Sequence, residues 1–253
     1  MAFFENTRKP TGFGGKVMVA MMNVGHGAVA RWGLQFLELA PDAKVLDCGC
    51  GGGANIKKLL KKCPQGIVKG IDYSSVSVEK TKKVNETAIA EGRCAVFQGS
   101  VEHMNFTDES FDVVTAFETV YFWPGLPKCF QEVYRVLKPG GIFLICNEAT
   151  GDTDKNDKWT QLIDGMTIYR DVELKAAMQE AGFMNIQIHK NPKDWLCVIG
   201  RKQEKESCRM RRDLGGIHNV TASDFGRIRI GRIAGIGLRH RHPQGRCWNG
   251  AFL

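Results

Sequence analysis

The 253-residue chain is 43% hydrophobic and 25% charged, an ordinary globular composition with enough length to bury a large core. It contains no run of about 18 apolar residues, so no membrane-spanning helix is expected. Its first residues lack the pattern of a secretory signal, which predicts a cytoplasmic protein. The nine cysteines are scattered through apolar segments, which favours buried thiols over a disulfide framework.

The net charge of +8 is unevenly distributed along the chain. Residues 1–202 contain 25 basic and 23 acidic side chains, whereas residues 203–253 contain 10 and 4. The first part is therefore nearly neutral. The basic balance of the whole chain is poor support for a nucleic-acid-binding enzyme.

Residues 1–40 are predicted to form a helical cap. Apolar residues recur at helical spacing between residues 14 and 39. The sequence Gly25-His26-Gly27 interrupts this pattern. Because glycine destabilises a helix, we expect two helices with a break at His26.

Residues 41–202 alternate between short apolar runs and longer amphipathic ones. This alternation predicts an α/β fold, a doubly wound and mostly parallel sheet with helices on both faces. The last two runs read as a hairpin, which places one antiparallel strand near the edge of the sheet. The predicted strands are residues 44–48, 67–71, 94–98, 111–117, 142–147, 185–189 and 195–200, and the predicted helices are residues 55–63, 76–91, 126–137 and 173–181.

Residues 203–253 form a basic tail of different composition. They contain eight glycines and ten basic residues and show no sustained helical or strand period, so no core is expected from them. One interpretation is an arginine-rich arm for nucleic acid or a membrane surface. We favour a disordered or non-native extension, because the arginines are diluted by glycine and isoleucine.

The segment from Asp47 to Gly53, DCGCGGG, follows the first predicted strand and precedes a helix. A glycine loop at a helix N-terminus lets a ligand approach the backbone closely and offers it unpaired N–H groups. The glycines also satisfy the dinucleotide pattern G-x-G-x-x-G/A, which would permit NAD. Asp47 would repel a pyrophosphate and attract a ligand with an ammonium and a sulfonium group, namely S-adenosylmethionine.

The same loop contains a C-x-C pair, Cys48 and Cys50. Such a pair could ligate a metal or act in redox chemistry. No second cluster of cysteine and histidine lies nearby in the sequence. We therefore expect two small side chains that line the loop, and no metal site.

Four segments resemble the motifs of the class I S-adenosylmethionine-dependent methyltransferases in the order found in that family. In the first, Asp47, Gly49, Gly51 and Gly53 occupy the D/E-x-G-x-G-x-G positions. The resemblance covers residues 1–202 and is nearest to the small-molecule branch that includes quinone-biosynthesis methylases. It implies a Rossmann-like sheet of seven strands. The other three segments are residues 70–74, 111–114 and 137–141.

The resemblance also implies roles for residues beyond the glycine loop. Asp72 ends the second strand, where an acid accepts hydrogen bonds from a ribose diol. Tyr73 could cover the adenine or ribose face. The family binds adenine after the third strand, where Ser100 or Glu102 would accept from the amino group and Val101 would contact the ring.

Residues 117–124 follow the fourth predicted strand, where open sheets bind ligands. We expect Glu118 to contact the cofactor and Tyr121 to line the acceptor pocket as a candidate catalytic residue. Phe122 and Trp123 are assigned to the core in preference to the pocket. The segment lacks the Asn-Pro-Pro-Tyr type of motif found in relatives that methylate amide or base nitrogens.

His26 is the second candidate catalytic residue. The two flanking glycines suit a side chain exposed to a cleft, where an imidazole could act as a base for a phenol, thiol or amine. A structural or solvated histidine is the alternative.

The sequence thus predicts a cytoplasmic methyltransferase, monomeric or homodimeric, that moves a methyl group from S-adenosylmethionine to a small molecule by in-line displacement. S-adenosylhomocysteine would be the product. Three alternatives stay open: an RNA methyltransferase that uses the basic tail, a nicotinamide-dependent dehydrogenase, and a cofactor-binding module without catalysis. Methyl transfer needs alignment but no covalent nucleophile, so the acceptor leaves no motif.

Overall fold

A seven-stranded sheet is the centre of the fold in the computed structural model, which describes residues 8, 10–152 and 156–204. The strand order is β3-β2-β1-β4-β5-β7-β6. Only β7 runs antiparallel to its neighbours β5 and β6, as the hairpin pattern predicts. The strands are β1 (Lys44–Cys48), β2 (Ile67–Asp72), β3 (Cys94–Gln98), β4 (Phe111–Phe117), β5 (Leu137–Asn147), β6 (Met184–Lys190) and β7 (Leu196–Arg201).

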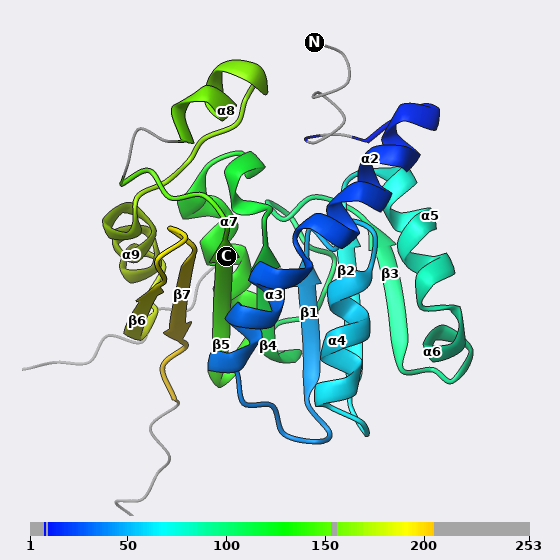
Figure 1. The fold of residues 1–253 in the computed structure, drawn as a ribbon. Coiled ribbons are helices and arrows are strands. Elements are labelled where there is room, and N and C mark those ends of the chain that lie inside the picture. The colour runs from blue at the N-terminus through cyan, green and yellow to red at the C-terminus, as the bar shows by residue number, and fades with distance from the viewer. Residues whose placement is uncertain (1–7, 9, 153–155, 205–253) are drawn as a thin grey trace, which may run out of the picture. The chain divides into compact units, whose positions relative to one another are not determined.

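Helices cover both faces of this sheet (Figure 1). Side chains of α3, α4 and α5 share a hydrophobic cluster with one face, and those of α7 and α9 share another with the opposite face. None of the described helices is both long enough and apolar enough to cross a membrane. The helices are α2 (Gly12–Gly25), α3 (Gly27–Gly33), η1 (Leu34–Phe36), α4 (Ala54–Lys62), α5 (Ser75–Val84), α6 (Glu86–Ala90), η2 (Val120–Phe122), α7 (Leu126–Val136), α8 (Asp157–Leu162) and α9 (Asp171–Glu180).

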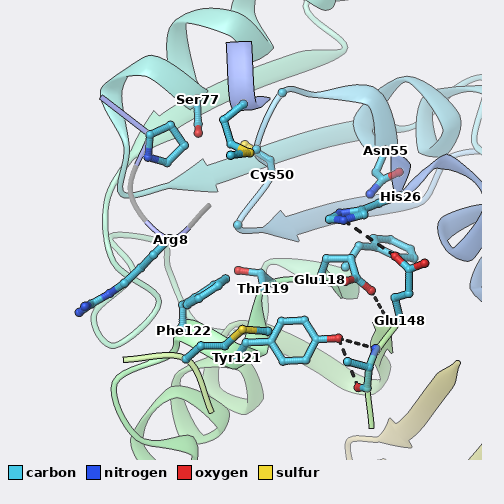
Figure 2. Close-up of a pocket in the computed structure, with 18 of the residues that line it drawn as sticks. Arg8, His26, Cys50, Asn55, Ser77, Glu118, Thr119, Tyr121, Phe122 and Glu148 are labelled. Atoms are coloured by element: carbon cyan, nitrogen blue, oxygen red, sulfur yellow. Dashed lines mark hydrogen bonds and ion pairs between the residues drawn. The ribbon is translucent and has the colours of Figure 1, made fainter. Parts of the chain in front are cut away.

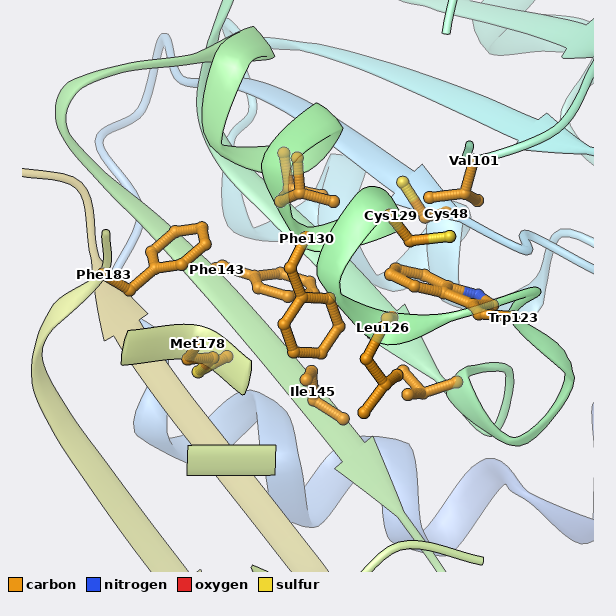
Figure 3. Close-up of a cluster of buried hydrophobic side chains, with 14 of the residues drawn as sticks. Cys48, Val101, Trp123, Leu126, Cys129, Phe130, Phe143, Ile145, Met178 and Phe183 are labelled. Carbon is orange, nitrogen blue, oxygen red and sulfur yellow. The ribbon is translucent and has the colours of Figure 1, made fainter. Parts of the chain in front are cut away.

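The strands carry apolar side chains on both faces, because each face is covered. On β5, Phe143 joins the cluster beneath α7, whereas Leu144 joins the cluster beneath α3 and α4. Trp123 is buried in the first cluster, with its ring 5.9 Å from Phe130 and 6.1 Å from Phe143 (Figure 3). The assignment of Trp123 to the core is thus confirmed.

Two predicted element boundaries are wrong, each for a tertiary reason. The helix expected over residues 76–91 is split into α5 and α6 at Asn85. The buried Asn85 amide donates to the carbonyls of Gly53 and Thr81, which holds its backbone at φ −117° and ψ 23°. The strand expected from residue 142 begins at Leu137, which pairs with Phe111 across a register shift.

Helix α3 lies unusually close to β5. A Cβ atom on Gly33 would stand 2.5 Å from the sulfur of Cys146, so only glycine permits this approach. The Cys146 thiol also donates to the carbonyl of Val29 at 3.5 Å. The contact fixes the start of α3, where His26 is the N-cap residue, relative to the end of β5.

The basic tail, residues 203–253, lies outside the described residues except for Gln203 and Glu204. Its predicted disorder therefore stays a prediction. Seven cysteines lie in the described part, and all are buried and free of disulfides, as their distribution predicts.

Candidate functional site

A cavity of about 730 Å³ lies at the carboxyl ends of the central strands. Its walls come from the loops after β1, β2, β4 and β5, together with parts of α2 and α8 (Figure 2). Strands β1 and β4 are neighbours at the point where the strand order reverses, and open α/β sheets bind ligands there. The volume is in the range of small-molecule sites, roughly 300 to 1,000 Å³.

The glycine loop forms one end of this cavity, which we call the loop end (residues 49–55 with Asp72 and Tyr73). Gly49 has φ +73°, and a Cβ atom there would stand 2.0 Å from the Thr119 hydroxyl. Gly51 has φ +52°, but a Cβ atom there would meet only a backbone oxygen at 4.0 Å. The loop is thus closed on its Thr119 side and open above Gly51, where a ligand can approach the backbone.

Asp72 fixes the shape of the loop end. One carboxylate oxygen accepts from the N–H of Gly51 and the other from the N–H of Ser74, each at 2.9 Å. Each oxygen can accept a second hydrogen bond, so the carboxylate can also receive a ligand hydroxyl. Burial raises the pKa of Asp72, while these backbone N–H groups act in the opposite direction. Tyr73 lines the cavity beside it, and burial raises its pKa to about 12, so its phenol is neutral.

Asp47 lies beneath the loop and does not line the cavity. It is buried on β1, and its carboxylate accepts from the Thr115 hydroxyl at 2.8 Å. Burial raises its pKa to about 7, despite the opposing effect of that hydrogen bond and of Lys58. Because the loop lies between Asp47 and the cavity, its carboxylate is not placed to contact a ligand there directly.

Three other side chains of the cavity lining lie close together, and we call them the carboxylate end (His26, Glu118 and Glu148). His26 is the N-cap residue of α3, Glu118 follows β4, and Glu148 follows β5. The His26 Nε2 atom is 3.9 Å from a Glu148 carboxylate oxygen. The Glu118 carboxylate accepts from the Glu148 N–H (Figure 2).

Burial and charge perturb the groups of the carboxylate end. Burial lowers the pKa of His26, although the charge of Glu148 acts in the opposite direction. Burial raises the pKa of Glu118 to about 8, and the nearby Glu148 contributes in the same direction. Glu118 also has a left-handed backbone, with φ +58°, which turns its side chain back toward the end of β5.

Tyr121 supports the carboxylate end. Its hydroxyl accepts from the N–H of Ala149 at 2.9 Å and donates to the carbonyl of the same residue at 3.3 Å. The hydroxyl is thus engaged with the backbone just after Glu148, and burial raises its pKa well above the usual range.

Cys48 and Cys50 are buried, as expected for small side chains at the loop. Their sulfurs face Met104 and Thr81, respectively, each at 3.9 Å. Burial raises the pKa of both thiols, so neither is a thiolate at neutral pH.

The structure brings most of the predicted site residues into one cavity. Those that line it are His26, Gly49, Gly51, Asp72, Tyr73, Glu118 and Tyr121. Asp47 and Gly53 support the loop from outside the cavity lining, and Ser100, Val101 and Glu102 also lie outside it. Val101 packs into the core, and Glu102 pairs with Lys128 at 3.5 Å.

Sequence reasoning missed several residues of the cavity. Glu148 is the first acid after the fifth strand, so its position at a carboxyl strand end was an available signal. Phe122, assigned above to the core, instead lines the cavity from the end of η2. The other lining residues without a prior assignment include Arg8, Thr119, Trp159 and Trp195.

Comparison with known proteins finds a family match for the central part of the chain. Residues 46–145 match a family model described as a methyltransferase domain. Cycloartenol-C-24-methyltransferase 1 of Oryza sativa subsp. japonica is 34% identical over 109 residues, which are 43% of this chain and 31% of that protein. Sterol 24-C-methyltransferase erg6 of Aspergillus fumigatus is 32% identical over 114 residues, 45% of this chain and 30% of that protein. The chain thus spans about a third of the length of these curated relatives.

Solved structures share the fold at low sequence identity. A chain from a complex that contains the Haloferax volcanii Trm112 methyltransferase activator superimposes with a TM-score of 0.69 at 19% identity, over 76% of this chain and 96% of that one. A SAM-dependent methyltransferase from Aquifex aeolicus gives a TM-score of 0.57 at 18% identity, over 72% and 92%. Residues 46–145 thus match a methyltransferase domain, and the solved structures share the fold of the chain.

Proposed function

We propose that this protein transfers a methyl group from S-adenosylmethionine to a small, largely apolar molecule. The observation that carries the proposal is a single cavity with two different ends. The loop end offers open backbone at Gly51 and the Asp72 carboxylate, which suit a nucleoside. The rest of the lining is rich in apolar side chains, among them Met18, Phe122, Trp159, Ile163, Met166 and Trp195.

The loop end fits the cofactor by shape and by charge. Open space above Gly51 admits a ligand backbone that a side chain would block. The Asp72 carboxylate has free lone pairs for a ribose diol. Asp47 is buried with a hydroxyl as its hydrogen-bond partner and would be stabilised by the positive charges of the bound cofactor. The assignment of Glu118 to the cofactor stays a prediction; its carboxylate accepts from the Glu148 N–H.

When bound, the cofactor supplies an electrophilic methyl group on its sulfonium. The chain then has to hold the acceptor in line with that methyl group and keep water out. Alignment of two bound reactants can supply roughly 7 to 11 kcal/mol of the barrier. Trp159, Ile163 and Met166 on one side and Met18 and Met21 on the other provide apolar walls for this purpose.

The curated relatives support an apolar acceptor. Their names describe methylation of sterols and of botryococcene. The aromatic and methionine side chains of the cavity are compatible with an acceptor of this kind. We therefore place this protein in the small-molecule branch, with a cap, residues 10–40, that contributes Met18, Met21 and His26 to the site.

Calorimetric titration tests the cofactor assignment. The full chain is expected to bind S-adenosylhomocysteine and not NADH. Binding of NADH alone would overturn the assignment in favour of a dehydrogenase. A methyl-transfer screen over a metabolite extract, read by mass gain, then separates an enzyme from a binding module and identifies the acceptor.

Truncation tests the RNA alternative. A variant without residues 203–253 is expected to keep the cofactor affinity and small-molecule turnover of the full chain. Loss of turnover on RNA in that variant would favour the alternative. The cytoplasmic location and the monomeric or homodimeric state remain predictions, which cell fractionation and light scattering measure.

A further inference from the structure

We propose that His26, Glu118 and Glu148 bind a divalent transition-metal ion at the carboxylate end of the cavity. The three side chains lie just before α3, just after β4 and just after β5, and no two are neighbours in the sequence. Each offers a ligand atom, and these atoms lie within 4.8 Å of one another. The site stands on this geometry, whereas its use in methyl transfer rests on the proposed function.

The distances suit a shared metal ion. Metal–ligand bonds from imidazole and carboxylate measure about 2.0 to 2.2 Å, so two ligands on one ion stand up to about 4.2 Å apart. His26 Nε2 and the Glu148 carboxylate oxygen are 3.9 Å apart, which is too long for a hydrogen bond but within that span. In Figure 2 one dashed line joins His26 to the Glu148 carboxylate, and another joins the Glu118 carboxylate to the Glu148 N–H.

Backbone contacts hold the three ligands in place. The Glu118 N–H donates to the Cys146 carbonyl at 3.0 Å, and the Glu118 carboxylate accepts from the Glu148 N–H. Gly33 keeps α3, and with it His26, against β5. Contacts of this type orient metal ligands in proteins.

Charge also favours a cation at this position. The two carboxylates lie close together, and in the described ranges Glu148 forms an ion pair with His26. Like charges at this range repel each other, and a dication would remove the repulsion. The prediction of no metal site was based on the cysteine pair of the loop alone. His26, Glu118 and Glu148 are far apart in the sequence, so they do not form a recognisable metal-binding motif.

The ligand types indicate the class of metal. Magnesium and calcium prefer oxygen ligands, whereas one imidazole with two carboxylates suits Mn²⁺, Fe²⁺, Co²⁺ or Zn²⁺. Three protein ligands leave coordination positions open, as in catalytic rather than structural sites. All three residues line the cavity, so an acceptor can reach those positions.

An open metal position in the acceptor region points to an oxygen acceptor, such as a hydroxyl group on an apolar molecule. A divalent ion lowers the pKa of an oxygen that it binds. The acceptor O–H would lose its proton to water, an O–CH₃ bond would form, and the S–CH₃ bond of the cofactor would break. The products are the methyl ether, S-adenosylhomocysteine and the released proton.

Electron paramagnetic resonance of free Mn²⁺ provides the test. The full chain is treated with EDTA, exchanged into metal-free buffer and titrated with MnCl₂. One bound ion per chain is expected, with an affinity at least about tenfold weaker in H26Q and in E148Q. E102Q is the matched control, because Glu102 pairs with Lys128 outside the cavity. The side chains of His26 and Glu148 are 34% and 47% exposed, so both variants should fold, which circular dichroism checks.

Two outcomes overturn the metal site: no Mn²⁺ binding by the unaltered chain, or equal affinity in H26Q, E148Q and E102Q. Displacement of bound Mn²⁺ by Zn²⁺ supports it, because Zn²⁺ binds nitrogen and oxygen sites more tightly. Titration with S-adenosylhomocysteine in EDTA separates the two proposals. Cofactor binding without Mn²⁺ binding overturns the metal site alone.

Discussion

The two ends of the cavity are built in different ways. At the loop end, the glycine loop and Asp72 meet across 21 residues of sequence, and the Gly51 N–H contacts the carboxylate directly. At the carboxylate end, His26, Glu118 and Glu148 come together only because α3, β4 and β5 pack as they do. The loop end relies on backbone conformation, whereas the carboxylate end relies on side chains. We therefore expect substitutions at the loop end to change cofactor affinity and substitutions at the carboxylate end to change Mn²⁺ binding.

The largest effect is expected for Gly49→Ala. The new Cβ would stand 2.0 Å from the Thr119 hydroxyl at φ +73°, so the loop has to move. We expect S-adenosylhomocysteine to bind about a hundredfold more weakly, and the free energy of unfolding to fall by roughly 1 to 3 kcal/mol. Calorimetry and thermal denaturation measure the two effects.

Gly92→Ala is the control for backbone strain. Gly92 has a similar φ of +71° but no atom within 4 Å of a new Cβ, and it lies outside the cavity. The Gly92→Ala variant should have a lower free energy of unfolding than the unaltered chain and the same affinity for S-adenosylhomocysteine. Equal loss of affinity in both variants would contradict a specific role for the loop.

Asp72→Ala is expected to weaken cofactor binding by roughly ten- to a hundredfold. The change removes the acceptor of the Gly51 and Ser74 N–H groups and the partner for the ribose. Asp112→Ala is the matched control, because Asp112 accepts from Lys44 and Lys138 away from the cavity. If both variants bind S-adenosylhomocysteine as the unaltered chain does, Asp72 is not a cofactor residue.

Asp47→Asn should weaken cofactor binding by about tenfold, because it removes a charge beneath the loop without changing the side-chain shape. It should also stabilise the fold in a pH-dependent way. The pKa of Asp47 is about 7 in the folded chain against an ordinary 3.8. Between these values the unfolded chain binds fewer protons, so the free energy of unfolding of the unaltered chain falls as the pH rises.

Asparagine does not titrate, so the variant escapes this loss. Its melting temperature should rise relative to the unaltered chain between about pH 4 and pH 7, by an amount that corresponds to roughly 1 to 4 kcal/mol. The difference in melting temperature across a pH series measures the effect. A constant difference would show that Asp47 is ionised throughout.

Tyr121→Phe is expected to leave cofactor affinity within about twofold and to lower the free energy of unfolding by roughly 1 to 3 kcal/mol. The change removes the partner of the Ala149 N–H in a buried position. Chemical denaturation and calorimetry measure the pair of effects. Tyr134→Phe serves as control, because that ring packs on Phe183 outside the cavity. A large loss of cofactor affinity would place Tyr121 at the loop end instead.

The smallest effect is expected for Arg8→Ala. The Arg8 side chain lines the cavity and reaches Asp164, with an exposed ion pair at 3.9 Å. Exposed pairs contribute about 0 to 1 kcal/mol, so stability should barely change. A change of a few-fold in cofactor affinity, measured by calorimetry, would show that the cap contacts the ligand; no change would restrict binding to the two ends.

The fold was predictable from the sequence because its signals are local. Alternating apolar runs indicated the strands and helices, and the terminal hairpin indicated the antiparallel strand. The glycine loop was predictable for the same reason, since its conformation depends on adjacent glycines. The break at Asn85 was not, because its cause is the carbonyl of Gly53 in another element.

The carboxylate end was only partly predictable. His26 and Glu118 were selected singly, but the sequence does not show that they face each other. Glu148 joins them because β5 lies beside β4 in the sheet. Phe122 was misplaced because it ends a single 3₁₀ turn, too short to have an apolar period that assigns its side chain to the core or to the cavity.

Because α3 packs closely on β5 at Gly33, the size of the residue at this position controls the distance between His26 and Glu148. Gly33 does not line the cavity, but any larger residue there would act as a wedge against Cys146. The wedge would separate the imidazole of His26 from the carboxylate of Glu148 without altering either. Substitution of Gly33 would therefore change the distance between the imidazole and the carboxylate while both side chains stay the same.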